Sequence, residues 1–183
     1  MKALLKLTSM LLTSQLVNAE PFGNLHQLAG HCWQADFPDG KKTDTHCFSL
    51  QYGGAFIVDN HVVCGPGATP YHGSTWYARD AETGGISYHY YNSLGMVSSG
   101  SVAFAGAHLL FPDETYQQNG QAVVYKTSWT LGEQHYTSVM TQQDDSHEGG
   151  WKPVWEMTFK QTDLADQQLV LRNSHHQLAC AQP

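Results

Sequence analysis

The feature of this chain that most restricts its fold is a succession of short strand-like runs, each ended by a cluster of turn-forming residues. About ten runs rich in aromatic and β-branched residues alternate in polarity with a period of two. Glycine pairs and Asn-Gly or Asp-Gly steps separate them and are typical of tight hairpins. The runs cover residues 29–37, 44–52, 55–64, 75–80, 85–92, 96–105, 108–111, 121–131, 134–143 and 152–161.

Such a pattern predicts an all-β fold. Sequential antiparallel strands with short links form a meander, and a long meander avoids exposed edges by closing into a barrel. We therefore expect a single antiparallel meander β-barrel of about 8–10 strands. Residues 162–177 follow the last run and either form a short C-terminal helix or continue as an irregular strap.

Alternation within the runs assigns some of the inward faces. Trp155, Met157 and Phe159 share one side of the last run and are predicted to face the interior. The series that ends at Trp129 alternates in the same way. Both sides of the run 85–92 carry aromatic residues, so alternation does not fix its inward face.

The cysteines add covalent constraints. The four cysteines, an even number, predict two disulfides in an exported chain, with three possible pairings. A turn centred on Asp39-Gly40 places Cys32 directly opposite Cys47, which leaves Cys64 for Cys180. A longer loop through Lys41 and Lys42 would shift this register and break the first pairing. Zinc ligation is the rival interpretation, but the chain has no Cys-x-x-Cys spacing.

The N-terminus has the layout of a secretory signal peptide. Lys2 precedes an apolar run that begins at Leu4, and Lys6 lies near the start of this run. The run ends at Val17-Asn18-Ala19, a small-residue cleavage site. We expect residues 1–19 to be removed and residues 20–183 to form one domain in an oxidising compartment, periplasmic or extracellular. The alternative is a frayed N-terminal helix of a cytosolic protein. The apolar run is shorter than the roughly 20 residues that span a bilayer, so we predict no membrane span.

Charge excludes two classes of partner. Without Lys2 and Lys6, 7 basic side chains face 16 acidic ones, which gives the predicted mature chain a formal charge of −9. Nucleic acid and anionic membrane surfaces are therefore poor partners. No protein partner is indicated by the sequence.

Motifs for catalysis or cofactor binding are not evident. The chain has no Gly-x-Ser-x-Gly, and its 11 histidines show no diagnostic metal spacing. The carboxylate pairs Asp113-Glu114 and Asp144-Asp145 fall in predicted turns, where acidic residues are usually solvated. We predict no catalytic residues, no metal and no cofactor from these patterns.

The segment 25–33, which contains Gly30 and Trp33, followed by a meander that ends in an aromatic strand, resembles the opening of a lipocalin-like barrel of the calycin type. Two residues separate Gly30 from Trp33, where lipocalins have one. The phrases at 52–57, 92–95 and 111–114 resemble uncharacterised exported bacterial lipocalin-like proteins.

The resemblance implies a barrel that either binds a small hydrophobic or amphipathic molecule or is filled by its own side chains. The aromatic residues allow the first alternative, with one amide to orient the ligand. The predicted ligand-binding residues are Trp76, Tyr88, Tyr90, Asn92, Trp129 and Trp155. These rings could equally be plain core residues.

Two other functions fit the same predicted scaffold. One is an enzyme, such as an isomerase, lyase or hydrolase, which an inward carboxylate or histidine beside an open cavity would favour. The other is a filled barrel that acts as a structural or interaction protein through its surface.

Overall fold

The computed structural model describes residues 21–162 and 178–180. Nearly all of the regular secondary structure in these residues is β-strand. Three short 3-10 helices, η1 (Gly23–Leu28), η2 (Tyr52–Gly54) and η3 (Glu148–Gly150), accompany the strands. The strands are β1 (Cys32–Asp36), β2 (Thr43–Gln51), β3 (Phe56–Cys64), β4 (Tyr71–Arg79), β5 (Ile86–Asn92), β6 (Val97–Ala105), β7 (His108–Leu110), β8 (Glu114–Gln118), β9 (Gln121–Leu131), β10 (His135–Gln143) and β11 (Trp151–Thr162).

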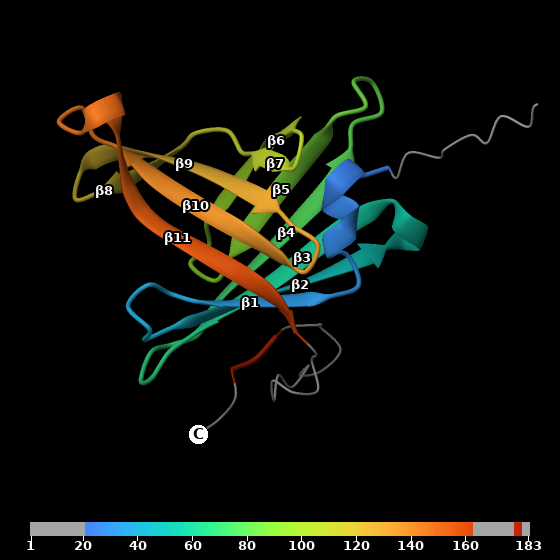
Figure 1. Ribbon diagram of the computed structural model, residues 1–183, viewed down its shortest axis with the longest axis horizontal. Helices are drawn as coiled ribbons and strands as arrows, with labels where there is room; N and C mark the ends of the chain where they lie inside the picture. Colours follow the sequence, from blue (N-terminus) through green and yellow to red (C-terminus); the bar gives the residue numbers. More distant parts are fainter. Residues whose placement is uncertain (1–20, 163–177, 181–183) are drawn as a thin grey trace, which may run out of the picture.

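The strands form one antiparallel sheet that closes on itself. Its order is β10-β11-β1-β2-β3-β4-β5-β6-β7-β9-β8, and a further pairing of β9 with β10 completes the barrel (Figure 1). Ten strands form the closed barrel, and β8 is the additional strand, paired with the first half of β9. The predicted all-β meander barrel is confirmed. Closure pairs both edges of every barrel strand over part of its length and so removes a free sheet edge.

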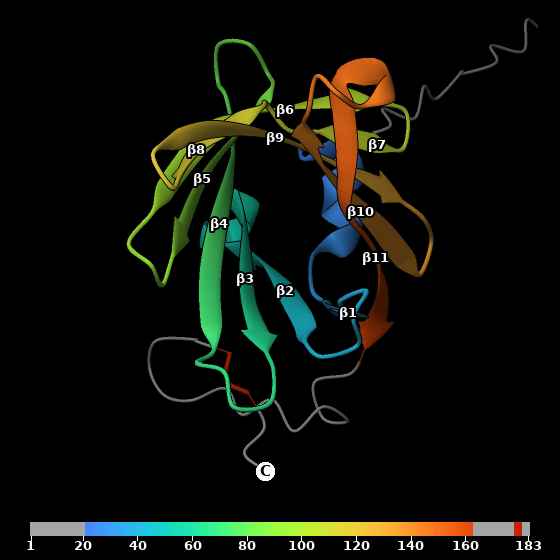
Figure 2. The same cartoon turned by 90° about the vertical axis from the view of Figure 1, so that its left-hand side faces the viewer.

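One end of the barrel is closed by η1 and the residues before it. Phe22, Leu25 and Leu28 are each at most 1 % exposed and pack into the hydrophobic core. Trp33 on β1 is equally buried, and its Nε1 donates a hydrogen bond to the carbonyl of Leu28 at 3.2 Å. Figure 2 looks into the barrel from the opposite end, with η1 behind the strands. The segment that resembles lipocalin-like proteins therefore packs as an end plug.

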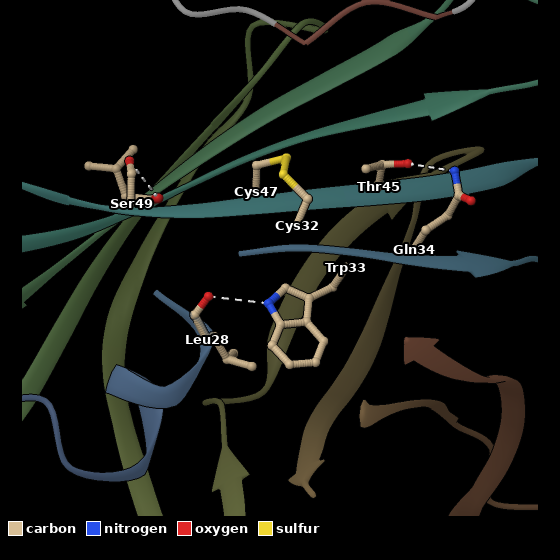
Figure 3. Close-up of a disulfide and its surroundings, with 8 residues drawn as sticks. Leu28, Cys32, Trp33, Gln34, Thr45, Cys47 and Ser49 are labelled. Carbon is tan, nitrogen blue, oxygen red and sulfur yellow. Dashed lines mark hydrogen bonds between the residues drawn. A yellow bond between two sulfur atoms is a disulfide. The ribbon is translucent and has the colours of Figure 1, made fainter. Parts of the chain in front are cut away.

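Both predicted disulfides are confirmed. Cys32 and Cys47 lie directly opposite each other on β1 and β2, with Cα atoms 4.1 Å apart, in the register expected from the Asp39-Gly40 turn. Figure 3 shows this bond on one side of β1 and the Trp33 side chain on the other. The second bond joins Cys64, the last residue of β3, to Cys180 across a sequence separation of 116 residues. It fixes the chain near its C-terminus to an early strand, with Leu178 buried beside it.

Some expectations fall on other parts of the chain. The predicted signal peptide and its cleavage site lie outside the described residues. So do residues 163–177, which cover nearly all of the segment expected to form a terminal helix or an irregular strap. Among the described residues, no helix has the length and hydrophobicity needed to cross a membrane. Two disulfides in one small chain are typical of an oxidising, exported environment.

Candidate functional site

The barrel encloses a cavity of about 650 Å³. Its lining includes Phe37 and Lys42 from the β1–β2 hairpin and Gln118 at the end of β8, but no residue of η1. The cavity therefore opens at the end of the barrel opposite η1. Figure 2 shows the β1–β2 hairpin at this end, with η1 behind it. Its wall on β2 to β6 and β8 carries carboxylates, imidazoles and hydroxyls, whereas its wall on β9 to β11 is mainly aromatic and apolar.

Five of the six residues predicted to bind a ligand line this cavity. They are Tyr88, Tyr90 and Asn92 on β5, Trp129 on β9 and Trp155 on β11.

Trp76 does not reach the cavity. Its neighbours Thr75 and Tyr77 on β4 point inward, so alternation turns Trp76 to the outer face of the barrel, where its ring meets that of Phe56. Asn92 is committed in part to the β5–β6 turn, because its Oδ1 accepts hydrogen bonds from the backbone amides of Leu94 and Met96.

Two Asp-x-His pairs on adjacent strands form the centre of the polar wall. Asp44 and His46 on β2 are two residues apart and so face the same side, and Asp59 and His61 on β3 repeat the pattern. The register places His46 directly opposite His61. All four side chains are buried or nearly so and line the cavity.

His46 is held between two carboxylates. Its Nδ1 lies 2.8 Å from Oδ2 of Asp59, and its Nε2 lies 3.3 Å from Oδ2 of Asp44. Burial alone would lower the pKa of His46, but the negative charges of Asp59 and Asp44 and the hydrogen bonds to them outweigh it and raise this pKa to about 10. His46 is therefore an imidazolium at neutral pH, donating from both ring nitrogens.

The same contacts act on Asp44. Burial raises its pKa, yet the charge of His46 and the hydrogen bonds from both histidines outweigh burial and hold the pKa of this carboxyl well below its usual range. Asp44 is thus the carboxylate that both histidines share.

A chain of hydrogen bonds continues from Asp44 toward the open end. Oδ1 of Asp44 accepts from Nδ1 of His61 at 3.1 Å, and Nε2 of His61 lies 3.2 Å from the hydroxyl of Tyr90. The Tyr90 hydroxyl in turn contacts that of Tyr71. Burial, followed by the hydrogen bond with Tyr71, raises the pKa of Tyr90 far above its usual range, so Tyr90 remains a neutral phenol.

Gly73 makes room for this chain. It lies directly opposite His61 in the β3–β4 register, and a Cβ atom at this position would be 2.0 Å from Nε2 of His61 and 2.7 Å from the Tyr90 ring. A side chain here would displace both residues, since contacts this short are not tolerated.

A second polar cluster centres on Glu114 of β8. Its carboxylate accepts hydrogen bonds from the hydroxyls of Ser98 at 2.7 Å, Tyr88 at 3.3 Å and Tyr116. Burial and the charge of Glu114 raise the pKa of Tyr88 to about 12. The prediction that Asp113-Glu114 forms a solvated turn is wrong for Glu114, which begins a strand and faces the cavity. Tyr90 and Ser98 are cross-strand partners, so the two polar clusters are adjacent.

Two buried side-chain atoms of the cavity lining have no hydrogen-bond partner within the described part of the chain. They are Oδ1 of Asp59 and the hydroxyl of Tyr136. Tyr136 belongs to the aromatic wall, where its ring stacks on Phe159 with centroids 4.5 Å apart and packs against Trp129 at 5.0 Å. Burial and the charges of Asp59 and Asp44 raise the pKa of Tyr136, so its hydroxyl keeps its proton.

The polar wall also has the composition of a metal site. Asp44, His46 and His61 each offer one ligand atom, and these atoms lie within 4.8 Å of one another. However, the hydrogen bonds between these side chains engage the same atoms, and His46 donates both of its protons to carboxylates. Because the candidate ligand atoms are engaged with one another in this way, we assign no metal to the site.

The sequence contains a signal for this network, a repeated Asp-x-His pattern. Asp44-Thr45-His46 and Asp59-Asn60-His61 share this pattern inside two consecutive predicted strands. The Gly53-Gly54 turn between them puts the two histidines in register. Two acidic and two imidazole side chains on one inner face are unusual enough to mark a site.

No protein-family model matches the chain, and no curated protein matches it at a significant level.

Proposed function

We propose that this protein is an exported binding protein that takes a small amphipathic molecule into the open end of its barrel. The observation that carries the proposal is the cavity of about 650 Å³ with one charged, hydroxyl-rich wall and one aromatic wall. An apolar ligand body would pack on the aromatic wall, while a few polar groups would fix its orientation. This division of labour is typical of small-molecule sites.

The size of the cavity argues against the filled-barrel alternative. Ligand pockets occupy about 300–1,000 Å³, and the cavity lies within this range. The large side chains of the end plug fill only the closed end, where Phe22, Leu25 and Leu28 are buried. The open half of the barrel therefore has room for a guest molecule, in agreement with the resemblance to lipocalin-like proteins.

The first test is native mass spectrometry of protein purified from an exporting host, beside a denatured spectrum of the same sample. We expect an additional mass of small-molecule size that disappears on denaturation. The second test is a fluorescence titration with the neutral probe N-phenyl-1-naphthylamine. Saturable binding of the probe is expected, and its failure to bind to a protein that also carries no additional mass would contradict the proposal.

A matched pair of variants locates the site of probe binding. Thr127 and Ser128 are neighbours on β9, but Thr127 lines the cavity and Ser128 does not. Thr127→Trp should fill the cavity and weaken probe binding at least about tenfold, since it removes the space the guest occupies. Ser128→Trp, which adds the same ring outside the cavity, should leave probe binding nearly unchanged.

An enzyme on the same barrel is the second candidate, because the cavity contains inward carboxylates and histidines. Asp44 fixes the orientation of His61, whose Nε2 meets the Tyr90 hydroxyl at the cavity. A histidine oriented by a carboxylate is a common general base. The two candidates differ in one measurement: a binding protein returns its eluted ligand unchanged after incubation, whereas an enzyme converts it and loses this activity in His61→Gln.

A further inference from the structure

The carboxylates of the cavity face the guest as hydrogen-bond acceptors. All three hydroxyls around Glu114 donate to it, so the protons of Ser98, Tyr88 and Tyr116 are committed and their oxygens are left to accept. Deeper in the barrel, Asp59 is 1 % exposed and its Oδ1 has no partner among the described residues. A buried carboxylate oxygen without a donor is costly, and a donor brought by a ligand would relieve that cost.

The charges of the side chains that line the cavity also favour a guest that donates hydrogen bonds. Asp44, Asp59 and Glu114 are opposed inside the barrel by the His46 imidazolium. Lys42 stands at the open end. These three carboxylates outnumber the two cations of the lining, His46 and Lys42, by one. The acidic balance of the whole chain adds a long-range attraction for cations.

The opposite wall suits the remainder of a cationic amphiphile. Trp129, Trp155, Phe111 and Phe159 line the cavity, and Phe111 and Trp129 pack with ring centroids 5.0 Å apart. Such rings bury apolar chains, and their faces also attract an ammonium group. The hydroxyls of Thr127, Ser138 and Tyr136 can donate or accept, so they set no preference of charge.

We propose that the cavity selects amphipathic amines, with the ammonium group on the acidic wall beside Glu114 and the apolar part on the aromatic wall. This inference rests on the proposed function, because it names the chemical class of the guest. It excludes fatty acids and other carboxylates as preferred ligands, since a second carboxylate beside Glu114 would meet like charge.

The test is a displacement assay at low ionic strength and neutral pH. N-phenyl-1-naphthylamine is bound first, and three competitors of equal chain length, dodecylamine, dodecanol and dodecanoate, are titrated below the concentration at which they form micelles. We expect dodecylamine to displace the probe at a concentration at least about tenfold below that of dodecanoate, with dodecanol between them.

Matched variants tie the preference to the cavity. Glu114→Gln removes the inward charge on a half-exposed strand residue and should reduce the preference for the amine about tenfold. Glu156→Gln removes the same charge from an exposed, outward position on β11 and should leave the preference intact. Probe binding should be unchanged in Glu156→Gln, and in each variant the preference is measured as the ratio of the dodecanoate and dodecylamine concentrations that displace half of the bound probe.

The outcomes separate the two proposals. Absence of probe binding would overturn both the proposed function and the amine selectivity. Probe binding with dodecanoate equal to or better than dodecylamine would leave the binding function standing and overturn the selectivity. An amine preference that is unchanged in Glu114→Gln, or lost equally in Glu156→Gln, would also overturn it, because general surface charge would then explain the result.

Discussion

His46 and His61 lie directly opposite each other on β2 and β3, and their imidazole rings stack with centroids 4.5 Å apart inside the barrel. Asp44 lies between them in the network, since one of its oxygens faces each ring. A shared carboxylate therefore holds the pair. Folding keeps His46 charged at neutral pH, because the contacts that raise its pKa exist only in the folded protein.

The stability of the fold should therefore decrease as the pH rises above neutral. The pKa of His46 rises from 6.5 to about 10 on folding, so its contribution is fully present below pH 6.5 and is lost as pH rises through about 10. We expect the free energy of unfolding, measured with a denaturant, to fall between pH 6.5 and 10. His46→Gln should flatten this slope, while the exposed outward His89→Gln should keep it. An unchanged slope in His46→Gln would contradict the charged assignment.

Asp59→Asn should destabilise the fold strongly. Asp59 is the deepest member of the network, and its Oδ2 accepts the shorter of the two hydrogen bonds from His46. Removing one partner of a buried ion pair costs about 3–5 kcal/mol. Denaturant unfolding of this variant should be compared with that of Asp113→Asn, an exposed carboxylate. Similar small losses in both variants would show that His46 does not depend on Asp59.

Gly73→Ala should disturb the site by steric overlap alone. The added methyl group would overlap His61 and Tyr90, and relief of such overpacking costs about 1–3 kcal/mol. The imidazole resonances of His61 in NMR spectra should shift at the same time. Gly85→Ala is the control, because an added Cβ there would come no closer than 3.3 Å, to Thr83. Native-like spectra and stability in Gly73→Ala would contradict the described packing of His61.

The two disulfides should differ in their contribution to stability. In the chain-entropy account, a bond that closes about 100 residues contributes about 4.7 kcal/mol and one that closes about 15 residues contributes about 3 kcal/mol. The separations here are 116 residues for Cys64–Cys180 and 15 for Cys32–Cys47. Replacing Cys64 and Cys180 by serine should therefore lower the free energy of unfolding more than replacing the other pair. The reverse order would show that local packing outweighs loop closure.

The sequence predicted the barrel and both disulfides because these depend on local rules. Alternation identified the inward residues Met157 and Phe159, and the Asp39-Gly40 turn fixed the register of Cys32 and Cys47. The start of β4 was wrong by four residues, since Tyr71 begins the strand where position 75 was expected. The extension includes Gly73, a poor strand former that is accommodated because His61 covers it.

The site was harder to predict because it depends on contacts between strands. The sequence pattern did not predict strand β8, because Asp113-Glu114 is typical of an acidic turn. The turn predicted at the Asn-Gly step, Asn119-Gly120, is present between β8 and β9. Pairing with β9 turns that segment into a strand and brings Glu114 to Ser98. Trp76 was assigned to the cavity on residue type alone, whereas the inward positions of Thr75 and Tyr77 place it outside.

Strand β8 has a hydrogen-bonded neighbour on one edge only, because it stands last in the sheet order next to β9. Side chains secure its other side, where Glu114 bridges to Tyr88 on β5 and Ser98 on β6. A guest that binds Glu114 would change these contacts directly. The backbone amides of residues 114–118 should therefore be the natural reporters of occupancy, slowing their exchange with deuterated solvent when the cavity is filled while the doubly paired strands change little.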